Sequence, residues 1–98
     1  MSAQESGSAL GAEVVLRRSA DLEWLEVDGE AVVWHRRHEQ LHRLDPIGTL
    51  VFQLCDGVTP LGVTVRELGE TFGRPQRVAE DVHELVAVLL CADVLERV

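Results

Sequence analysis

The hydrophobic pattern of this chain changes its period once, at Asp45-Pro46, and that change is the strongest constraint on its fold. Before it, apolar residues alternate imperfectly, as in strands; after it, they recur three and four residues apart, as in helices. Asp45 is a favourable N-cap, and Pro46 suits the first position of a helix. Strands followed by helices, without an internal repeat, predict an α+β fold in which the helices pack on one face of a small sheet.

The strands are predicted from two turns. Asp28-Gly29 separates two β-rich runs, and an Asp-Gly pair in this position is typical of a type I′ turn, whose two central residues need positive φ. We therefore expect strands at 22–27 and 30–36. A second turn near 37–39 leads to a third strand at 40–44, so the three strands form an antiparallel meander with the last one at an edge.

The first helix begins after Asp45 and carries apolar residues at the i, i+3, i+4 and i+7 positions, namely Ile47, Leu50, Val51 and Leu54. Gly57 is its expected C′ residue, and a loop at 58–63 follows. A short second helix is predicted to begin at Thr64 as N-cap, with Glu67 at the capping-box position. Leu68 and Phe72 are predicted to face inward, and Gly73 is predicted to end this helix.

The third helix, at about 76–92 after Pro75, has an unusual apolar surface. Its core stripe is Val78, Val82, Leu85, Val86 and Leu89, but every residue from 85 to 91 is apolar. Two readings remain open: the hairpin and a short extended segment at the end of the chain cover the extra surface, or part of the surface lines a groove for a partner.

Composition and charge limit the possible functions. The net charge is −8 and the nine basic residues are all arginine, so a broad basic surface for nucleic acid is not expected. Residues 1–13 are small and polar, without the pattern of a signal peptide, and are predicted to be a disordered tail before a domain at 14–98. No apolar run reaches the roughly 20 residues of a membrane span, and a cytoplasmic protein is expected. Cys55 and Cys91 lie in apolar helical patterns and are expected to be buried, reduced thiols.

The stretch "WHRRHEQLHRL" brings His35, His38 and His42 close together in sequence. A zinc site needs ligands that converge on one point, and neither a Cys-x-x-Cys nor a His-Glu-x-x-His spacing is present. No phosphate-binding glycine loop or Gly-x-Ser-x-Gly motif occurs either. We therefore expect no metal, no cofactor and no catalysis.

The same stretch contains the edge strand at 40–44. Charged side chains commonly protect the edge strand of a sheet from pairing with other chains, and His42 and Arg43 fit that role. An edge can also accept an extended peptide as an added strand. The residues alone leave both interpretations open.

The sequence resembles the PqqD-like domains, also called recognition elements of ribosomally synthesised and post-translationally modified peptides. "VDGEAVVW" followed by "LHRLDPIGTLVFQLCDG" is similar to the hairpin and first helix of that family, and "TVRELGETFG" and "VAEDVHELVAVLL" are similar to its second and third helices. The family positions are occupied here by Leu44, Asp45, Gly48, Leu54, Asp56 and Gly57, with Asp81-Val82 further on. The resemblance covers about residues 14–98. The loop at 58–63 is longer than expected, and "CADVLERV" lacks a glycine that is common in the family.

This resemblance implies a winged-helix-like fold, a three-stranded antiparallel sheet followed by three helices, and a non-catalytic function. Such domains bind the leader segment of a precursor peptide as a strand along the third strand, in a cleft against the third helix, and deliver it to a modifying enzyme. The implied peptide-binding residues here are Arg37, Gln40, Leu41, His42, Arg43, Leu44, Val78, Asp81, Val82, Leu85 and Leu89. Arg37 and Arg43 would pair with carboxylates of the leader.

Two alternatives remain. A winged-helix nucleic-acid-binding regulator has the same elements, although the third helix carries Glu80, Asp81 and Glu84 where phosphate contacts would be needed. A small regulatory subunit could instead bind another protein through the apolar third helix.

Overall fold

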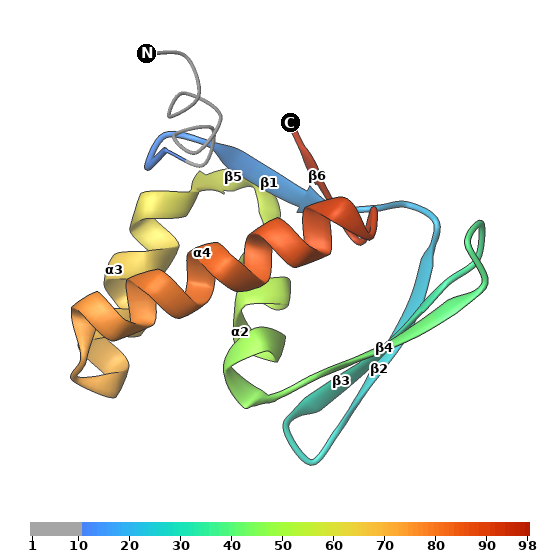
Figure 1. Ribbon diagram of the computed structural model, residues 1–98, viewed down its shortest axis with the longest axis horizontal. Helices are drawn as coiled ribbons and strands as arrows, with labels where there is room; N and C mark the ends of the chain where they lie inside the picture. Colours follow the sequence, from blue (N-terminus) through green and yellow to red (C-terminus); the bar gives the residue numbers. More distant parts are fainter. Residues whose placement is uncertain (1–10) are drawn as a thin grey trace.

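The computed structural model describes residues 11–98, and most of the tail predicted at 1–13 lies outside that range. The elements are the strands β1 (Val15–Arg18), β2 (Leu22–Val27), β3 (Glu30–His35), β4 (Gln40–Leu44), β5 (Asp56–Pro60) and β6 (Leu95–Arg97), and the helices α2 (Pro46–Leu54), α3 (Leu61–Phe72) and α4 (Pro75–Cys91). Figure 1 shows α4 lying across α2 and α3, with the β2–β3–β4 sheet to one side of the helices and the short strands β1, β5 and β6 on the other.

The α+β class and the meander are confirmed, but the single sheet is not. The strands form two three-stranded antiparallel sheets, one in the order β2-β3-β4 and the other in the order β5-β1-β6. The loop predicted at 58–63 therefore lies partly in β5. Of this second sheet the sequence indicated only β6, as a short extended segment at the end of the chain, and β1 and β5 were not predicted. Its pairings join segments far apart in the chain.

The hairpin turn follows its sequence signal. Asp28 and Gly29 have φ values of 54° and 81°, and the pair Val27↔Glu30 closes a two-residue connection, as a type I′ turn requires. The register of β3 against β4 runs from Ala31↔Leu44 to His35↔Gln40. The predicted edge strand is therefore present with the expected bounds.

Helix α2 begins as predicted but ends differently. The Oδ1 atom of Asp45 accepts a hydrogen bond from the N–H of Gly48 at 2.7 Å, and Pro46 is the first helical residue. The prediction of Gly57 as C′ residue is wrong, because the helix ends at Leu54 and Gly57 belongs to β5. A side chain from β1 closes this helix instead: Arg18 donates to the carbonyls of Phe52 and Gln53 at 3.1 and 2.9 Å.

Helix α3 begins three residues before the predicted N-cap. The N–H groups of Leu61 and Gly62 donate to the carbonyls of Val14 and Ala12, at 2.7 and 2.8 Å, so backbone from the start of the described chain replaces a side-chain cap. Thr64 consequently lies inside the helix and is buried. The predicted capping box is therefore wrong, since it depends on a helix start that a distant segment determines.

At the end of α3, the prediction for Gly73 is confirmed and the prediction for Phe72 is wrong. Gly73 has φ of 72° and closes the helix in the left-handed conformation, as predicted. Phe72 does not face the core, because its exposed fraction is 42%. Gly69 allows the close crossing of α3 and α4, since an added Cβ atom would lie 3.0 Å from the Cα of Pro75.

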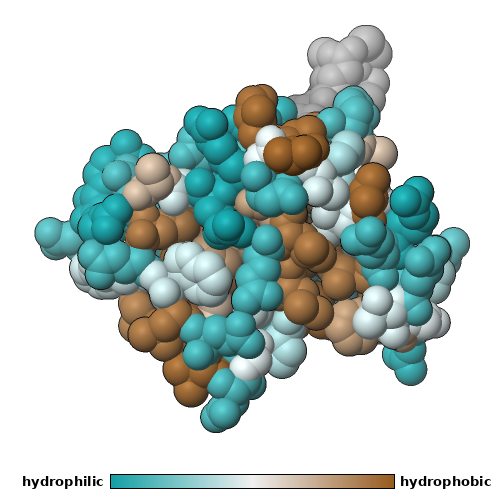
Figure 2. Space-filling view, turned by 180° about the vertical axis from the view of Figure 1, so that it is seen from behind, coloured by the Kyte–Doolittle hydropathy of each residue, from teal (hydrophilic) through white to brown (hydrophobic). Residues whose placement is uncertain are grey.

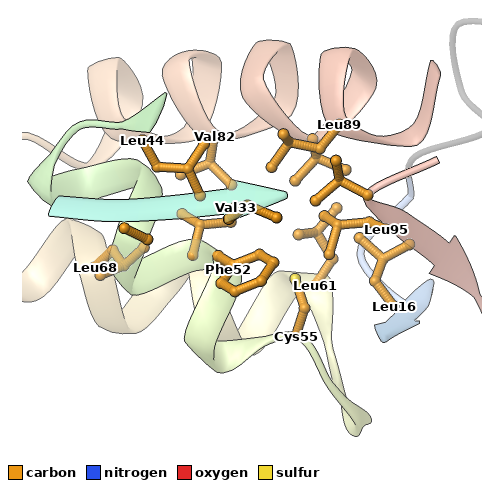
Figure 3. Packing of buried hydrophobic residues seen from close by; sticks show 14 of the residues in the cluster. Leu16, Val33, Leu44, Phe52, Cys55, Leu61, Leu68, Val82, Leu89 and Leu95 are labelled. Atoms are coloured by element: carbon orange, nitrogen blue, oxygen red, sulfur yellow. The ribbon is translucent and has the colours of Figure 1, made fainter. Parts of the chain in front are cut away.

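The core lies between the helices and the inner face of the β2–β3–β4 sheet. Figure 3 shows buried side chains from β3, α2, α3, α4 and β6 converging on one cluster, with Val33 and Phe52 near its centre. Trp24 of β2 packs edge-on against Phe52 with ring centroids 5.0 Å apart. Helix α4 contributes Val78, Val82, Val86 and Leu89 to this core.

Candidate functional site

The free edge of β4 is the first component of the candidate site. Strand β3 is central in its sheet, so its backbone groups point alternately toward β2 and toward β4. The N–H of Arg36 donates to the carbonyl of Asp21 on the β2 side. The N–H of Ala31 donates to Thr49 Oγ1, which itself donates to the carbonyl of Leu44 at the end of β4. The odd-numbered residues of β3 therefore face β4.

This alternation identifies the backbone groups at the free edge. Gln40, His42 and Leu44 are the register partners of the odd-numbered β3 residues, so their backbone groups face β3. The backbone N–H and C=O groups of Leu41 and Arg43 then point away from the sheet. These two residues are well exposed, Leu41 to 61%, and can pair with an added strand.

A hollow of about 470 Å³ lies beside the end of β4, between the first turn of α2 and one face of α4. Its lining residues are Asp45, Ile47, Gly48, Asp81, Glu84, Leu85 and Val88. An added Cβ atom on Gly48 would lie 3.0 Å from Asp45 Oδ1 and 3.3 Å from Leu85 Cδ2, so the glycine keeps the hollow open. We call the apolar lining side chains of Ile47, Leu85 and Val88 the floor of the hollow, and the carboxylates of Asp45, Asp81 and Glu84 its walls.

The structure divides the predicted residues of α4 into two groups. Asp81 and Leu85 line the hollow, whereas Val78, Val82 and Leu89 are almost fully buried in the core. The core residues support the helix that forms the wall and offer no surface to a ligand. The helix therefore contributes to the site through a face next to its core stripe.

Sequence reasoning missed five lining residues: Asp45, Ile47, Gly48, Glu84 and Val88. A signal for two of them was present. Asp81, Glu84, Leu85 and Val88 stand at i, i+3, i+4 and i+7, which places them on one face of α4. Val88 is 59% exposed, and an exposed apolar residue on that face marks the hollow.

The predicted residues of β4 and its preceding turn are spread over different environments. Gln40, Leu41 and Arg43 are exposed, His42 is half-buried, and Leu44 is buried. Arg43 forms an ion pair with Glu30 at 3.3 Å. Arg37 lies at the β3–β4 turn, near Asp21 and Asp93, at 3.8 and 4.0 Å, and away from the residues that line the hollow.

The histidines of this region have structural contacts. His35 is fully buried; its Nδ1 accepts from the N–H of His38, so its Nε2 carries the hydrogen and donates to the carbonyl of Asp93 at 3.2 Å. His38 Nε2 lies 2.7 Å from Asp93 Oδ2, and this hydrogen bond is the main cause of the lowered pKa of Asp93. Within residues 11–98, no group of three or more potential ligands is placed to hold a metal ion.

The two thiols differ, contrary to expectation. Cys55 is buried, and this burial raises its pKa from 9.0 to about 11. Cys91 is exposed, so its predicted burial is wrong: the last turn of α4 extends past the core. Both thiols are free.

No helix in the described part of the chain is long and apolar enough to cross a membrane.

Comparisons with known proteins bear on the family and the fold of this chain. A family model described as "Coenzyme PQQ synthesis protein D (PqqD)" matches residues 30–95, which include β3, β4 and all three described helices. A solved structure described as "TbiB1 in Complex with the TbiA(beta) Leader Peptide" has a similar fold, with a TM-score of 0.73 over 82% of this chain and 94% of that chain, at 18% sequence identity. No curated protein matches the sequence.

Proposed function

This chain belongs to the PqqD family, and from that premise we propose that it binds the leader segment of a ribosomally synthesised precursor peptide and delivers it to a modifying enzyme. The observation that carries the proposal is the outer edge of β4, which pairs with no strand among residues 11–98, beside a hollow on α4. The structural match to a protein that was solved with a leader peptide supports it. The chain itself catalyses no step in this proposal.

The leader adds to β4 as a further strand. Its backbone pairs with the outward-facing groups of Leu41 and Arg43, which sets the register. Because side chains alternate along a strand, every second leader residue points toward the helices, and one of these enters the hollow at Leu85 and Val88. Backbone pairing gives affinity for many sequences, and the hollow gives selectivity.

Amide hydrogen exchange tests this mode of binding residue by residue. The probe is a synthetic peptide with the leader sequence of a precursor encoded beside this gene. We expect the peptide to slow exchange at the amides of Leu41 and Arg43, because these groups gain hydrogen bonds. The amides of Gln40, His42 and Leu44 already face β3 and should change much less. Saturable binding without this alternation would contradict strand addition, and no binding to the folded protein would contradict the function.

A proline variant tests the same edge. Leu41→Pro removes an outward-facing N–H while leaving the β3 pairing intact, and we expect the leader to bind roughly tenfold more weakly. Leu41→Val keeps the N–H and is the matched control. Leu44→Pro is unsuitable, because the Leu44 backbone faces β3 and its loss would disturb the sheet. Equal affinity of the Pro and Val variants, with both folded, would contradict the role of this edge.

The outer face of the β2–β3–β4 sheet supports the delivery step. The described surface carries apolar side chains among its charged ones, and one face is shown in Figure 2. Leu25, Trp34 and Leu41 are 57%, 36% and 61% exposed and border a hollow of about 330 Å³ on this sheet. Because Leu41 is also at the free edge, an enzyme that covers this face would contact the added leader strand as well.

Charge variants separate enzyme binding from leader binding. Trp34→Glu is expected to weaken association with a peptide-modifying enzyme that acts on the bound precursor, measured by calorimetry, while leader affinity stays within roughly twofold. Val58→Glu places the same charge on β5, at a residue that is 76% exposed, and is the control. Equal enzyme affinity of both variants would exclude this face as the docking surface.

The exposed face of α4 disfavours nucleic acid as the ligand. Glu80, Asp81 and Glu84 are all exposed on this helix, and they would repel phosphate groups. A steep loss of duplex DNA affinity with increasing salt would be the signature of that alternative.

A further inference from the structure

The hollow beside β4 combines an apolar floor with acidic walls, and we propose that it selects leaders carrying a basic residue next to an apolar anchor. The inference rests on the proposed function and specifies the class of peptide that this chain accepts. It reverses the charge preference predicted from the arginines of the "WHRRHEQLHRL" stretch.

The floor accepts an apolar side chain. Ile47 and Leu85 are partly buried, Val88 is 59% exposed, and Gly48 provides space at the first turn of α2. A volume of about 470 Å³ exceeds the needs of one leucine-sized side chain, so adjacent parts of the leader also contact its walls. An exposed apolar residue such as Val88 gains most when a partner side chain covers it.

The walls carry excess negative charge. Asp45, Asp81 and Glu84 line the hollow. One oxygen of Asp45 is already bonded to the N–H of Gly48, and Asp81 lies 3.9 Å from Arg77 in an exposed pair. Glu84 has no ion-pair partner within residues 11–98. Three carboxylates therefore face one guanidinium, and Glu84 is the group best placed to receive a cation from the leader.

The arginines of the edge do not oppose this field. Arg43 pairs with Glu30 and lies with Val32 on the outer side of the sheet. Arg37 is held near Asp21 and Asp93 at the far end of β4. Arg37 and Arg43 each lie near carboxylates of the chain itself. The three carboxylates of the hollow, in contrast, have only the guanidinium of Arg77 nearby as an ion-pair partner within residues 11–98. A leader with a lysine or arginine beside its anchor thus matches the hollow, and one with an acidic residue there is repelled.

The test uses a fluorescein-labelled synthetic leader of the precursor encoded beside this gene, with each lysine or arginine changed in turn to glutamine and to glutamate. Binding to the full chain is measured by fluorescence anisotropy at about 0.01 M and at about 0.15 M ionic strength. The protein variants are Glu84→Arg and Glu84→Gln. Glu70→Arg makes the same charge change on an exposed residue of α3, outside the hollow, and is the control.

We expect Glu84→Arg to weaken binding by roughly fivefold at low salt, Glu84→Gln to have a smaller effect, and both effects to shrink at higher salt. One basic residue of the leader should be sensitive, and its replacement by glutamate should restore binding to the Glu84→Arg variant. Thermal unfolding of each variant shows whether it is folded, and the glutamine variant provides the test if the arginine variant is not.

Three results would overturn the inference. Equal effects of Glu84→Arg and Glu70→Arg would show only a response to net charge. Tight binding that is insensitive to every basic residue of the leader would leave the proposed function intact and remove the charge selectivity. Absence of leader binding to the folded wild-type chain would remove both.

Discussion

At the scale of single residues, Asp56 organises the start of β5. Its Oδ1 accepts hydrogen bonds from the N–H groups of Val58 and Thr59, at 2.9 and 2.8 Å, and its Oδ2 accepts one from the Thr59 hydroxyl. These bonds favour the ionised carboxylate and lower its pKa from 3.8 to about 2. Asp56, which occupies a position of the family motif, thus stabilises a turn through its side chain.

This shift predicts a pH dependence of stability. Because the pKa of Asp56 is lower in the folded state, its contribution is fully present above about pH 4 and is lost as the pH falls toward about 2. Asp56→Asn should lower the midpoint of urea unfolding at neutral pH, and the difference from wild type should shrink as the pH falls through about 2. Asp28→Asn, on the exposed β2–β3 turn, is the control. An Asp56→Asn difference that does not depend on pH would contradict this assignment.

The two thiols should react at very different rates. Cys91 is exposed, whereas Cys55 is buried with a pKa raised to about 11, so only Cys91 offers an accessible thiol. Titration of the native protein with a disulfide reagent should label one thiol quickly and the second only after unfolding. Cys91→Ser should abolish the fast phase, and its persistence in that variant would contradict the placement of α4.

At the scale of elements, α2 is joined to the end of the β4 strand by one hydroxyl group. Thr49 is buried; its Oγ1 accepts from the N–H of Ala31 at 2.7 Å and donates to the carbonyl of Leu44 at 3.3 Å. The pairing of β3 with β4 ends at Ala31 and Leu44. Thr49 forms the hydrogen bonds that the N–H of Ala31 and the carbonyl of Leu44 would otherwise lack. The helix that provides Gly48 to the hollow is thereby fixed relative to the edge that receives the leader.

Removing this hydroxyl should therefore destabilise the fold. Thr49→Val keeps the shape of the side chain but leaves a buried N–H and a buried carbonyl without partners, which costs about 1–3 kcal/mol in free energy of unfolding. Thr49→Ser keeps the hydroxyl and should cost less. Urea unfolding followed by circular dichroism measures both, and a valine variant as stable as the serine variant would show that this bridge has no energetic role.

At the scale of the whole molecule, His35 connects the two sheets. It lies at the end of β3, and its ring bonds both to the β3–β4 turn at His38 and to the carbonyl of Asp93, just before β6. Asp93 has φ of 62°, so the chain turns sharply here to place β6 beside β1. Two histidines of the cluster, His35 and His38, therefore form a junction between the sheets.

A pair of histidine variants tests this junction. His35→Leu should lower the free energy of unfolding by about 1–3 kcal/mol, because it removes the buried ring and leaves the N–H of His38 and the carbonyl of Asp93 without it as a hydrogen-bond partner. His42→Leu is the matched control. His42 Nε2 is buried without a hydrogen-bond partner in the part of the chain described, so its loss should be neutral or stabilising. Equal destabilisation by the two substitutions, measured in urea, would contradict the junction.

Several features followed from the sequence because they depend on few neighbouring residues. Asp28-Gly29 formed the predicted turn, Asp45-Pro46 began a helix, and Gly73 ended one, since turn and cap geometry is local. The edge strand at 40–44 was predicted from the short turn that follows the hairpin at 37–39. The order of these motifs was enough to indicate the PqqD family.

The tertiary structure decided the features that depend on distant partners. The β5-β1-β6 sheet joins segments from both ends of the described chain, and α3 begins where Val14 and Ala12 satisfy its first N–H groups. On α4, the hydrophobic pattern could not separate Leu85, which lines the hollow, from Val82, which is fully buried. A helix exposes many faces, and only the packing of other elements determines which face remains for a ligand.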